Sequence, residues 1–297
     1  MKIFVSLFVI LFPIFVSADT EIIAPHAPGG PSDMIARAVH TNLPKNEYRI
    51  VYKPGAGTLL GINHVMTTNS MLISGFIHTY ITNPKIYDNL FYDPDKDLEI
   101  IATLAVMPNV LVCHKKTEFK SYNDFVSNTK TLNFGIAGVG STEHIATEIL
   151  FNEIRKKHIL IPYSQGGKSA VTDLLGGHID CIFSNYPTIK NFVKEESLVF
   201  LISTHKLDST ISWEEKFHKK FPFQSILGIV INSKLNKETK NKIIVDLRNH
   251  LHKSNNKLFE LGFFPIISTE KSMIDYAIQN NKETSFLIDH LNIRLKN

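Results

Sequence analysis

Short runs of apolar residues alternate along this chain with segments in which apolar residues recur every three or four positions. The first pattern is typical of buried strands, and the second is typical of helices with one apolar face. Because strands and helices take turns along the chain, the pattern predicts an α/β fold with parallel sheets covered by helices. The expected strands cover residues 21–24, 49–52, 71–74, 100–105, 110–113, 132–136 and 179–183, and the two clearest helix faces consist of Met34, Ile35, Ala38, Val39 and Leu43 and of Ile145, Ala146, Ile149, Leu150 and Ile154.

The N-terminal segment differs from the rest of the chain, because Lys2 is followed by an almost unbroken apolar run over residues 3–16 and then by two small residues. The run is too short to span a bilayer comfortably, and the small residues match a cleavage site. Residues 1–18 are therefore expected to be a secretory signal peptide that is removed before Asp19. The alternative is an uncleaved N-terminal anchor. In both cases the folded part lies outside the cytoplasm, which predicts a periplasmic location.

Composition narrows the class of protein further. The chain has 297 residues, of which 43% are hydrophobic and 20% are charged, so a disordered, collagenous or disulfide-scaffold protein is excluded. A chain of this length favours two lobes over a single core. The net charge of +4 comes from 32 basic and 28 acidic residues spread along the sequence. Without a basic stripe, we expect no nucleic-acid partner.

Two cysteines, Cys113 and Cys181, each lie in an apolar, strand-like run. A disulfide needs Cα atoms within about 7 Å of each other, whereas buried free cysteines are common. The sequence therefore favours two buried thiols and leaves a bridge open as the alternative. There is no cysteine cluster that would bind a metal ion.

Two glycine-rich turns, residues 27–33 and 135–144, each join an expected strand to an expected helix. Pro31 suits the first turn of a helix, and Ser141 or Thr142 is expected to cap the second helix. Free backbone N–H groups and the positive end of the helix dipole make each turn a candidate anion site. Two such turns facing each other would form a clamp for a carboxylate. Neither turn contains Lys or Arg, so the affinity is expected to come from aligned backbone dipoles.

Signatures of common enzymes are absent from the sequence or incomplete. The P-loop pattern fails twice, because Ser141 stands where Lys is required in one segment and Pro162 stands where the first Gly belongs ahead of Lys168 in another. The hydrolase pentapeptide Gly-x-Ser-x-Gly and the zinc motif His-Glu-x-x-His do not occur. The 13 His residues are scattered. We therefore expect no catalytic activity, no cofactor and no metal site.

Several further motifs follow one another along the chain. In the first half they are 24–33 (APHAPGGPSD), 53–57 (KPGAG), 83–84 (NP) and 92–98 (YDPDKDL), and in the second half 108–112 (PNVLV), 132–141 (LNFGIAGVGS), 161–163 (IPY), 173–180 (DLLGGHID) and 185–188 (NYPT). In this order and spacing, the sequence resembles the solute receptors of tripartite tricarboxylate transporters, the Bug family. The resemblance runs from about residue 22 to residue 276, nearly the whole mature chain.

The resemblance implies a two-lobed periplasmic binding protein fold of type II, in which each lobe is a mixed sheet flanked by helices and the ligand lies in the cleft between them. Lobe one would comprise residues 19–107 and 224–297, and lobe two residues 108–223. The implied function is to bind a small carboxylate, a di- or tricarboxylate or related organic acid, and to deliver it as a monomer to membrane transporter subunits. Two alternatives stay open: an interaction protein that signals ligand state to a membrane sensor, and an extracytoplasmic hydrolase, whose mechanistic residues are missing.

The family generally holds its ligand with backbone N–H groups, hydroxyls and ordered water, and this pattern carries over to both turns. Asp33 is expected to cap the helix or to order the turn, because its carboxylate would repel an anion. Tyr163 and Asn185 either donate hydrogen bonds to the ligand or only pack. The implied binding residues are Gly29, Gly30, Pro31, Ser32, Asp33, His78 and Thr79 in lobe one and Ala137, Gly138, Gly140, Ser141, Thr142, His144, Tyr163 and Asn185 in lobe two.

Segment 76–79 departs from the family, which usually has small or hydroxyl residues there. Its sequence, Phe-Ile-His-Thr, predicts a narrower and drier cleft. His78 lies either on the wall of the cleft or on its rim. On the wall, with an unperturbed pKa of about 6.5, it would make a dicarboxylate bind more tightly as the pH falls towards about 6.

Overall fold

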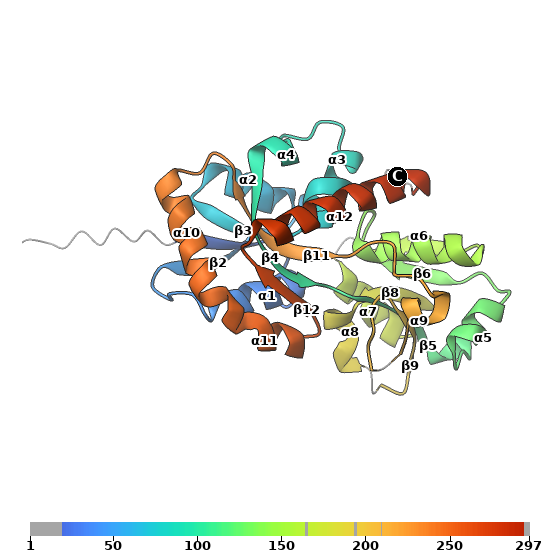
Figure 1. The fold of residues 1–297 in the computed structure, drawn as a ribbon. Helices are drawn as coiled ribbons and strands as arrows, with labels where there is room; N and C mark the ends of the chain where they lie inside the picture. Colours follow the sequence, from blue (N-terminus) through green and yellow to red (C-terminus); the bar gives the residue numbers. More distant parts are fainter. Residues whose placement is uncertain (1–19, 164–165, 193–194, 209, 294–297) are drawn as a thin grey trace, which may run out of the picture.

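The computed structural model describes residues 20–163, 166–192, 195–208 and 210–293, which form two six-stranded sheets flanked by helices. The two layered units, called lobe one and lobe two, lie side by side along the long axis of the molecule (Figure 1). The expected signal peptide and its cleavage site lie outside the described residues. Within those residues, no helix has both the length and the apolar character required to cross a membrane.

Lobe one is built on the sheet β12-β4-β11-β3-β1-β2. Strands β1, β2 and β3 are parallel, whereas β11 pairs antiparallel with β3 and β4, and β12 pairs antiparallel with β4. The sheet is therefore mixed, as the family resemblance implies and unlike the all-parallel sheet that the hydrophobic pattern predicts. The strands are β1 (Thr20–Ala24), β2 (Tyr48–Tyr52), β3 (Ser70–Gly75), β4 (Leu98–Val106), β11 (Ile226–Asn232) and β12 (Phe264–Ser268).

Lobe two is built on the sheet β10-β9-β5-β8-β6-β7 and is also mixed. Strands β6, β7 and β8 are parallel, and β5 pairs antiparallel with β8 and β9. The chain crosses from lobe one to lobe two between β4 and β5, and returns before β11. The strands are β5 (Asn109–His114), β6 (Asn133–Ile136), β7 (Ile159–Pro162), β8 (Cys181–Asn185), β9 (Leu198–Ser203) and β10 (Ile211–Ser212).

The helices bury the apolar faces that their spacing predicts. Ile35 and Val39 of α1 and Ile145 and Leu150 of α6 are fully buried, and Leu43 joins the core of lobe one just beyond the end of α1. The helices associated with lobe one are α1 (Pro31–His40), η1 (Ala56–Thr58), α2 (Leu59–Thr67), η2 (Ile77–Thr82), α3 (Asn83–Ile86), α4 (Pro94–Asp97), α10 (Lys237–His250), η5 (Leu251–Ser254), α11 (Asn255–Glu260) and α12 (Lys271–His290), and those of lobe two are η3 (Lys115–Thr117), α5 (Tyr122–Ser127), α6 (Thr142–Ile154), α7 (Gly167–Leu175), α8 (Tyr186–Ile189), η4 (Lys190–Phe192) and α9 (Trp213–Phe217).

The two lobes share one apolar core on the side of η2 and α12. Ile77 and Ile81 of η2 and Ile288 of α12 belong to the cluster that also contains Phe134 and Phe151 of lobe two. Figure 1 shows α12 running from lobe one until it lies above α6. Because this apolar contact ties the lobes together on one side, any opening of the molecule would have to hinge about it.

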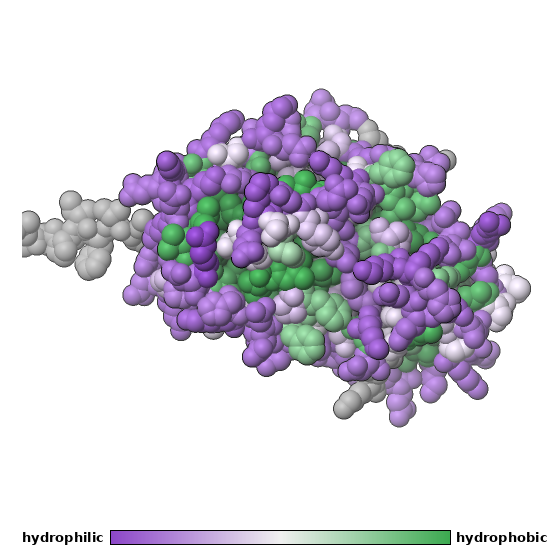
Figure 2. Space-filling view, in the orientation of Figure 1, coloured by the Kyte–Doolittle hydropathy of each residue, from purple (hydrophilic) through white to green (hydrophobic). Residues whose placement is uncertain are grey.

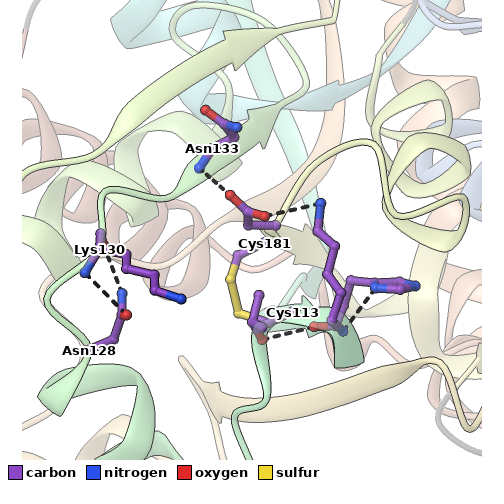
Figure 3. The surroundings of a disulfide bond; sticks show 9 residues. Cys113, Asn128, Lys130, Asn133 and Cys181 are labelled. Carbon is purple, nitrogen blue, oxygen red and sulfur yellow. Dashed lines mark hydrogen bonds and ion pairs between the residues drawn. A yellow bond between two sulfur atoms is a disulfide. The ribbon is translucent and has the colours of Figure 1, made fainter.

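A disulfide joins Cys113 of β5 to Cys181 of β8, two residues that lie directly opposite each other in the antiparallel pair (Figure 3). The expectation of two free thiols is therefore wrong. Neither apolar run reveals which strand it pairs with, and that pairing brings the two Cα atoms to 4.0 Å. At the other end of the same strand pair, Asn109 lies opposite Asn185. The disulfide thus fixes the register of the strands that carry these two side chains.

Candidate functional site

The glycine-rich turn of lobe one is ordered by the carboxylate of Asp33. Asp33 Oδ2 accepts a hydrogen bond from the backbone N–H of Gly29 at 2.6 Å, and its Oδ1 accepts from Arg37 Nε at 2.8 Å and from the Tyr52 hydroxyl at 2.6 Å. Burial would raise the pKa of Asp33, but these hydrogen bonds and the Arg37 charge outweigh it and hold the pKa below its usual value. The expectation that Asp33 orders the turn is confirmed.

The N-terminus of α1 is left without a side-chain cap. Gly30 occupies the N-cap position in an extended conformation, and it has no side chain that could form a cap hydrogen bond to the first turn. A Cβ built on Gly30 would meet only the carbonyl oxygen of Ala27, at 3.7 Å, so a ligand atom can approach the backbone there. The Ser32 hydroxyl lies 3.1 Å from His26 Nδ1. Free N–H groups at the positive end of a helix dipole, beside a hydroxyl, form an anion site.

Two histidines flank this turn. The rings of His26 and His78 lie 6.2 Å apart in an edge-to-face arrangement. Burial lowers the pKa of His26, and burial together with the His26 charge lowers the pKa of His78 to about 4. The assumption of an unperturbed His78 is therefore wrong, because a pKa of about 4 leaves its ring neutral at pH 6. The neutral ring of His78 still supplies one N–H donor.

The remaining residues of segment 76–79 do not narrow the cleft as the sequence predicts. Phe76 is fully buried in the core of lobe one, and Ile77 joins the core shared with lobe two. Thr79 is buried, with its hydroxyl 2.6 Å from that of Ser74. His78, on the π-helical turn η2, keeps partial exposure. The bulky side chains thus build the cores, and Thr79 has an internal partner for its hydroxyl.

The glycine-rich turn of lobe two is closed by its own side chains. Ser141 caps α6 by accepting the His144 N–H at 3.1 Å, and His144 Nδ1 accepts the Gly140 N–H at 3.1 Å. Ser141, rather than Thr142, is therefore the N-cap. Glu148 lies 3.8 Å from His144 Nε2 and 3.2 Å from His158 Nε2, and its interactions with these two histidines lower its pKa to about 2. Ser141 and His144 therefore position the turn.

A buried acid lies at the same helix terminus. Glu143 accepts hydrogen bonds from the Thr142 hydroxyl at 3.0 Å and from Asn185 Nδ2 at 2.6 Å, and Asn185 Oδ1 accepts from Asn109 Nδ2 at 2.9 Å. Only 5% of Glu143 is exposed, and this burial raises the pKa of its carboxyl group. Of the two roles left open for Asn185, contact with the ligand or packing, these contacts favour a structural one, because Asn185 holds Glu143 in place.

Tyr163 is directed to its own lobe. Its hydroxyl donates a hydrogen bond to Asp173 of α7 at 2.7 Å, and burial together with this carboxylate raises the pKa of Tyr163 to about 12. Of the two roles left open by the sequence, packing is the one that the contacts favour. The side chain holds α7 against the end of β7.

The N-terminus of α7 connects the two turns. A Cβ built on Gly167 would lie 3.2 Å from Oε1 of Glu143, and a Cβ built on Gly29 would lie 2.5 Å from Nζ of Lys168. Of these two consecutive residues of lobe two, Gly167 therefore lies against Glu143 in its own lobe, and Lys168 reaches the Gly29 turn of lobe one. Lys168 brings a cation to the turn whose sequence contains none, so the expectation that backbone dipoles act alone needs correction.

Space remains beside these groups. A Cβ on Gly138 or on Gly166 would have no neighbouring atom within 4 Å. At Gly140, by contrast, a Cβ would lie 2.7 Å from Ile86 and 3.2 Å from Thr82 of lobe one. The lobes thus meet closely at Gly140, whereas the backbone at Gly138 is unobstructed.

Glu143, Lys168, His26 and Asn109 are site residues that the sequence did not single out. Lys168 was visible only as part of an incomplete P-loop, and Glu143 only as one residue of the second turn. Their roles depend on contacts between segments that are distant in sequence. In the portion of the chain that the structure covers, no group of three or more His, Cys, Asp or Glu could hold a metal ion.

A hollow of about 640 Å³ lies on lobe one between β4, α10 and α12. Figure 2 shows apolar side chains gathered on this face beside α12. Its walls include Ile100 and Ile274 together with the ion pair of Lys271 and Asp275. It contains neither glycine-rich turn. We favour the space between the turns as the ligand site, because free backbone donors and a cation converge there.

Comparison with known proteins supplies the family. The family model "Tripartite tricarboxylate transporter family receptor" matches residues 35–292. A protein of Agrobacterium vitis, named from the TAR-I ttuE-ttuC' intergenic region, is 31% identical over 176 residues, which cover 55% of this chain and 50% of that protein. The chain spans about half the length of the curated relatives it matches, and up to 61% for BugT of Bordetella pertussis.

Solved structures share the whole architecture. The periplasmic binding protein BugD matches with a TM-score of 0.80 and 20% identity, covering 94% of this chain and 99% of BugD. A protein of R. palustris solved with adipate matches with a TM-score of 0.82 and 20% identity, covering 95% of this chain and all of the other. At this level of identity the likeness shows the fold, and it confirms the two-lobed binding-protein architecture.

Proposed function

The chain belongs to the tripartite tricarboxylate transporter receptor family, and we propose that it is a periplasmic receptor that binds a small carboxylate and delivers it to membrane transporter subunits. The family description names receptors, and the fold neighbour from R. palustris was solved with a carboxylate, adipate. We assign lobe one to residues 19–107 and 224–297 and lobe two to residues 108–223, acting as a monomer without catalytic activity.

The convergence of Lys168 on the Gly29–Gly30 turn carries the proposal. The turn offers uncapped N–H groups at the start of α1, and the Lys168 ammonium reaches it from the other lobe. A carboxylate placed there would accept charge-assisted hydrogen bonds from both lobes, which are stronger than hydrogen bonds between neutral groups. Because those contacts exist together only when the lobes are closed, ligand binding would favour the closed state.

Native mass spectrometry of protein purified without refolding tests the proposal. We expect a small organic acid to accompany the protein and to raise its melting temperature when it is added back. A protein that carries no acid, and that no acid in a broad panel stabilises, would contradict the receptor function. Turnover of the bound acid would instead support the hydrolase alternative.

A further inference from the structure

Strand β4 has a free edge in lobe one. On one side it pairs with β11 along its whole length, from Leu98 to Val106. On the other side its pairing with β12 ends at Thr103, so within the described residues no strand pairs with residues 98–102 there, and no backbone hydrogen bond from a loop or helix replaces one. Such an edge carries unpaired N–H and C=O groups that can pair with another chain.

The free edge opens into the hollow of about 640 Å³, whose lining includes the four consecutive residues Leu98 to Ile101 of β4. Consecutive residues of a strand point to opposite faces of the sheet. Ile101 packs in the same cluster as Leu247 of α10, and Ile100 packs in the same cluster as Ala277 of α12. The two helices therefore cover opposite faces of the sheet and form the two walls of a slot, and apolar side chains are visible beside α12 in Figure 2.

The slot has the length of a short extended segment. Residues 98–102 span about 17 Å at about 3.3 Å per strand residue. The lining of α12 runs from Lys271 to Ser285, which is about 21 Å at 1.5 Å per helical residue. Side chains of an added strand would point alternately towards Ile244 of α10 and towards Ile274 of α12.

Polar side chains of the lining are also without partners. The hydroxyl of Tyr80 is buried, and in the part of the chain that the structure describes it has no hydrogen-bond partner. Arg248 and Lys282 form no ion pair with any described residue, whereas Asp95 is the single acid of the lining in that condition, because the other two are paired with lysines. The unpaired charge is therefore positive in excess, which favours an acidic occupant.

We propose that the slot beside β4 is an interaction surface that takes up an extended, acidic peptide segment of a partner protein as an added strand. The free edge supplies main-chain hydrogen bonds, which only an extended backbone can match, and the walls accept its apolar side chains. A compact apolar ligand would leave the edge of β4 unpaired. The slot contains neither glycine-rich turn, so this inference goes beyond the proposed receptor function and does not depend on it.

Fluorescence anisotropy of the labelled pentapeptide Glu-Val-Ile-Val-Glu, titrated with the purified protein, tests the inference. Neighbouring residues of an added strand direct their N–H groups to opposite sides. One N-methyl group, placed on the isoleucine or on an adjacent valine, should therefore act unequally. One isomer should bind about 10-fold more weakly than the parent peptide, and the other about equally. Lys-Val-Ile-Val-Lys should also bind about 10-fold more weakly.

Variants locate the binding in the slot. Ile278→Asp puts a charge on the α12 wall and should weaken peptide binding about 10-fold or more. Ile278 is 37% exposed, so the variant should fold. Val245→Asp is the matched control, because Val245 of α10 is 50% exposed and lies outside the lining. Arg248→Glu/Lys282→Glu should abolish the preference for the acidic peptide. Lys168→Met, at the lobe-one turn, should leave peptide affinity unaltered.

Three outcomes would overturn the inference. Equal affinities of the two methylated isomers would show apolar adhesion without strand addition. Undetectable binding of the acidic peptide at millimolar protein would show that the edge accepts no strand. A dimer in sedimentation velocity that Ile278→Asp dissociates would assign the edge to a second copy of this chain. None of these results concerns the acid that accompanies the protein, so the receptor function is tested separately.

Discussion

The two glycine-rich turns look alike in the sequence and differ in what they leave free. In lobe one, Asp33 orders the turn from its rear, and Gly30 at the N-cap leaves the first N–H groups of α1 uncapped. In lobe two, Ser141 caps α6, His144 binds the Gly140 N–H, and Glu143 lies at the helix terminus. A glycine-rich turn before a helix can therefore serve as an anion site only where side chains of the protein do not already accept hydrogen bonds from its backbone N–H groups.

The two lobes also differ in the interactions that stabilise each of them internally. Lobe two contains the disulfide between Cys113 and Cys181, whereas the cores of lobe one consist of packed apolar side chains alone. The shared apolar contact at η2 and α12 joins the two. The comparison predicts that lobe two depends on a covalent link that lobe one lacks.

Removing the disulfide should produce the largest change. In the double variant Cys113→Ala/Cys181→Ala, loss of a cross-link between residues 68 positions apart is expected to lower the free energy of unfolding of lobe two by about 4 kcal/mol on the chain-entropy model. Trp213 is the single tryptophan and is buried in lobe two, so its fluorescence in a urea titration reports this lobe. An unchanged midpoint would show that the link contributes no stability.

Removing the cation at the lobe-one turn should have the next largest effect. Lys168→Met is expected to weaken binding of every carboxylate by about 10-fold or more, because a charge-assisted hydrogen bond is lost. Lys168→Arg should retain most of the affinity. Lys219→Met, which removes a surface ion pair of lobe two, is the control. Equal affinities for Lys168→Met and the wild-type protein would place the carboxylate elsewhere.

A methyl group on the lobe-one turn tests whether the ligand touches the backbone. Gly30→Ala fits the backbone, because φ is −88° and the nearest atom to the new Cβ is 3.7 Å away. We expect the free energy of unfolding to change by less than about 0.5 kcal/mol and the affinity to fall about 10-fold through a lost hydrogen bond. Gly138→Val is a poorer probe, because φ is +115° there and valine would strain the fold. Unaltered affinity in Gly30→Ala would show that the ligand does not closely approach the backbone at Gly30.

The smallest effect concerns His78. Because its pKa in the folded protein is about 4, ligand affinity should not change between pH 7.5 and 6, in the wild-type protein or in His78→Ala. The unfolded chain binds a proton near pH 6.5 and the folded protein does not, so His78 should reduce stability as the pH falls from about 6.5 to 4.

Urea midpoints at pH 7 and pH 5 measure this effect of His78. His78→Ala should lose less stability between these values than the wild-type protein, although His26, 6.2 Å away, contributes a similar dependence. His252→Ala, at an exposed position, is the control. The prediction would be contradicted if the affinity of the wild-type protein for diacids rose towards pH 6 and this rise were absent in His78→Ala. That result would show that His78 is charged at pH 6.

The fold was predictable where the pattern is local. The expected strands at residues 21–24, 49–52 and 71–74 lie within β1, β2 and β3. The sequence missed β7, which has only four residues, and β12, which is half-buried at the sheet edge. It also missed that β11 inserts between β3 and β4. That pairing joins segments more than a hundred residues apart, and no local periodicity encodes it.

The site residues likewise divide into those that the local sequence predicts and those that it does not. The role of Asp33 was predictable, because an acid just after a glycine-rich turn can accept a backbone N–H of that turn, here the N–H of Gly29. Glu143 gave no such signal, since acids in a first helical turn are ordinarily solvated and favourable. Its burial comes from Asn185 and Gly167. The contact of Lys168 with Gly29 depends on both lobes, so it emerges only in three dimensions.

A crystal structure of the protein with the acid that accompanies it on purification tests the central difference between the lobes most directly. The account predicts that the ligand carboxylate lies on the N–H groups at Gly30 and Ser32, within hydrogen-bond distance of Lys168 Nζ, while Glu143 remains at the N-terminus of α6. A ligand carboxylate at the N-terminus of α6, with Glu143 displaced from Thr142 and Asn185, would contradict it.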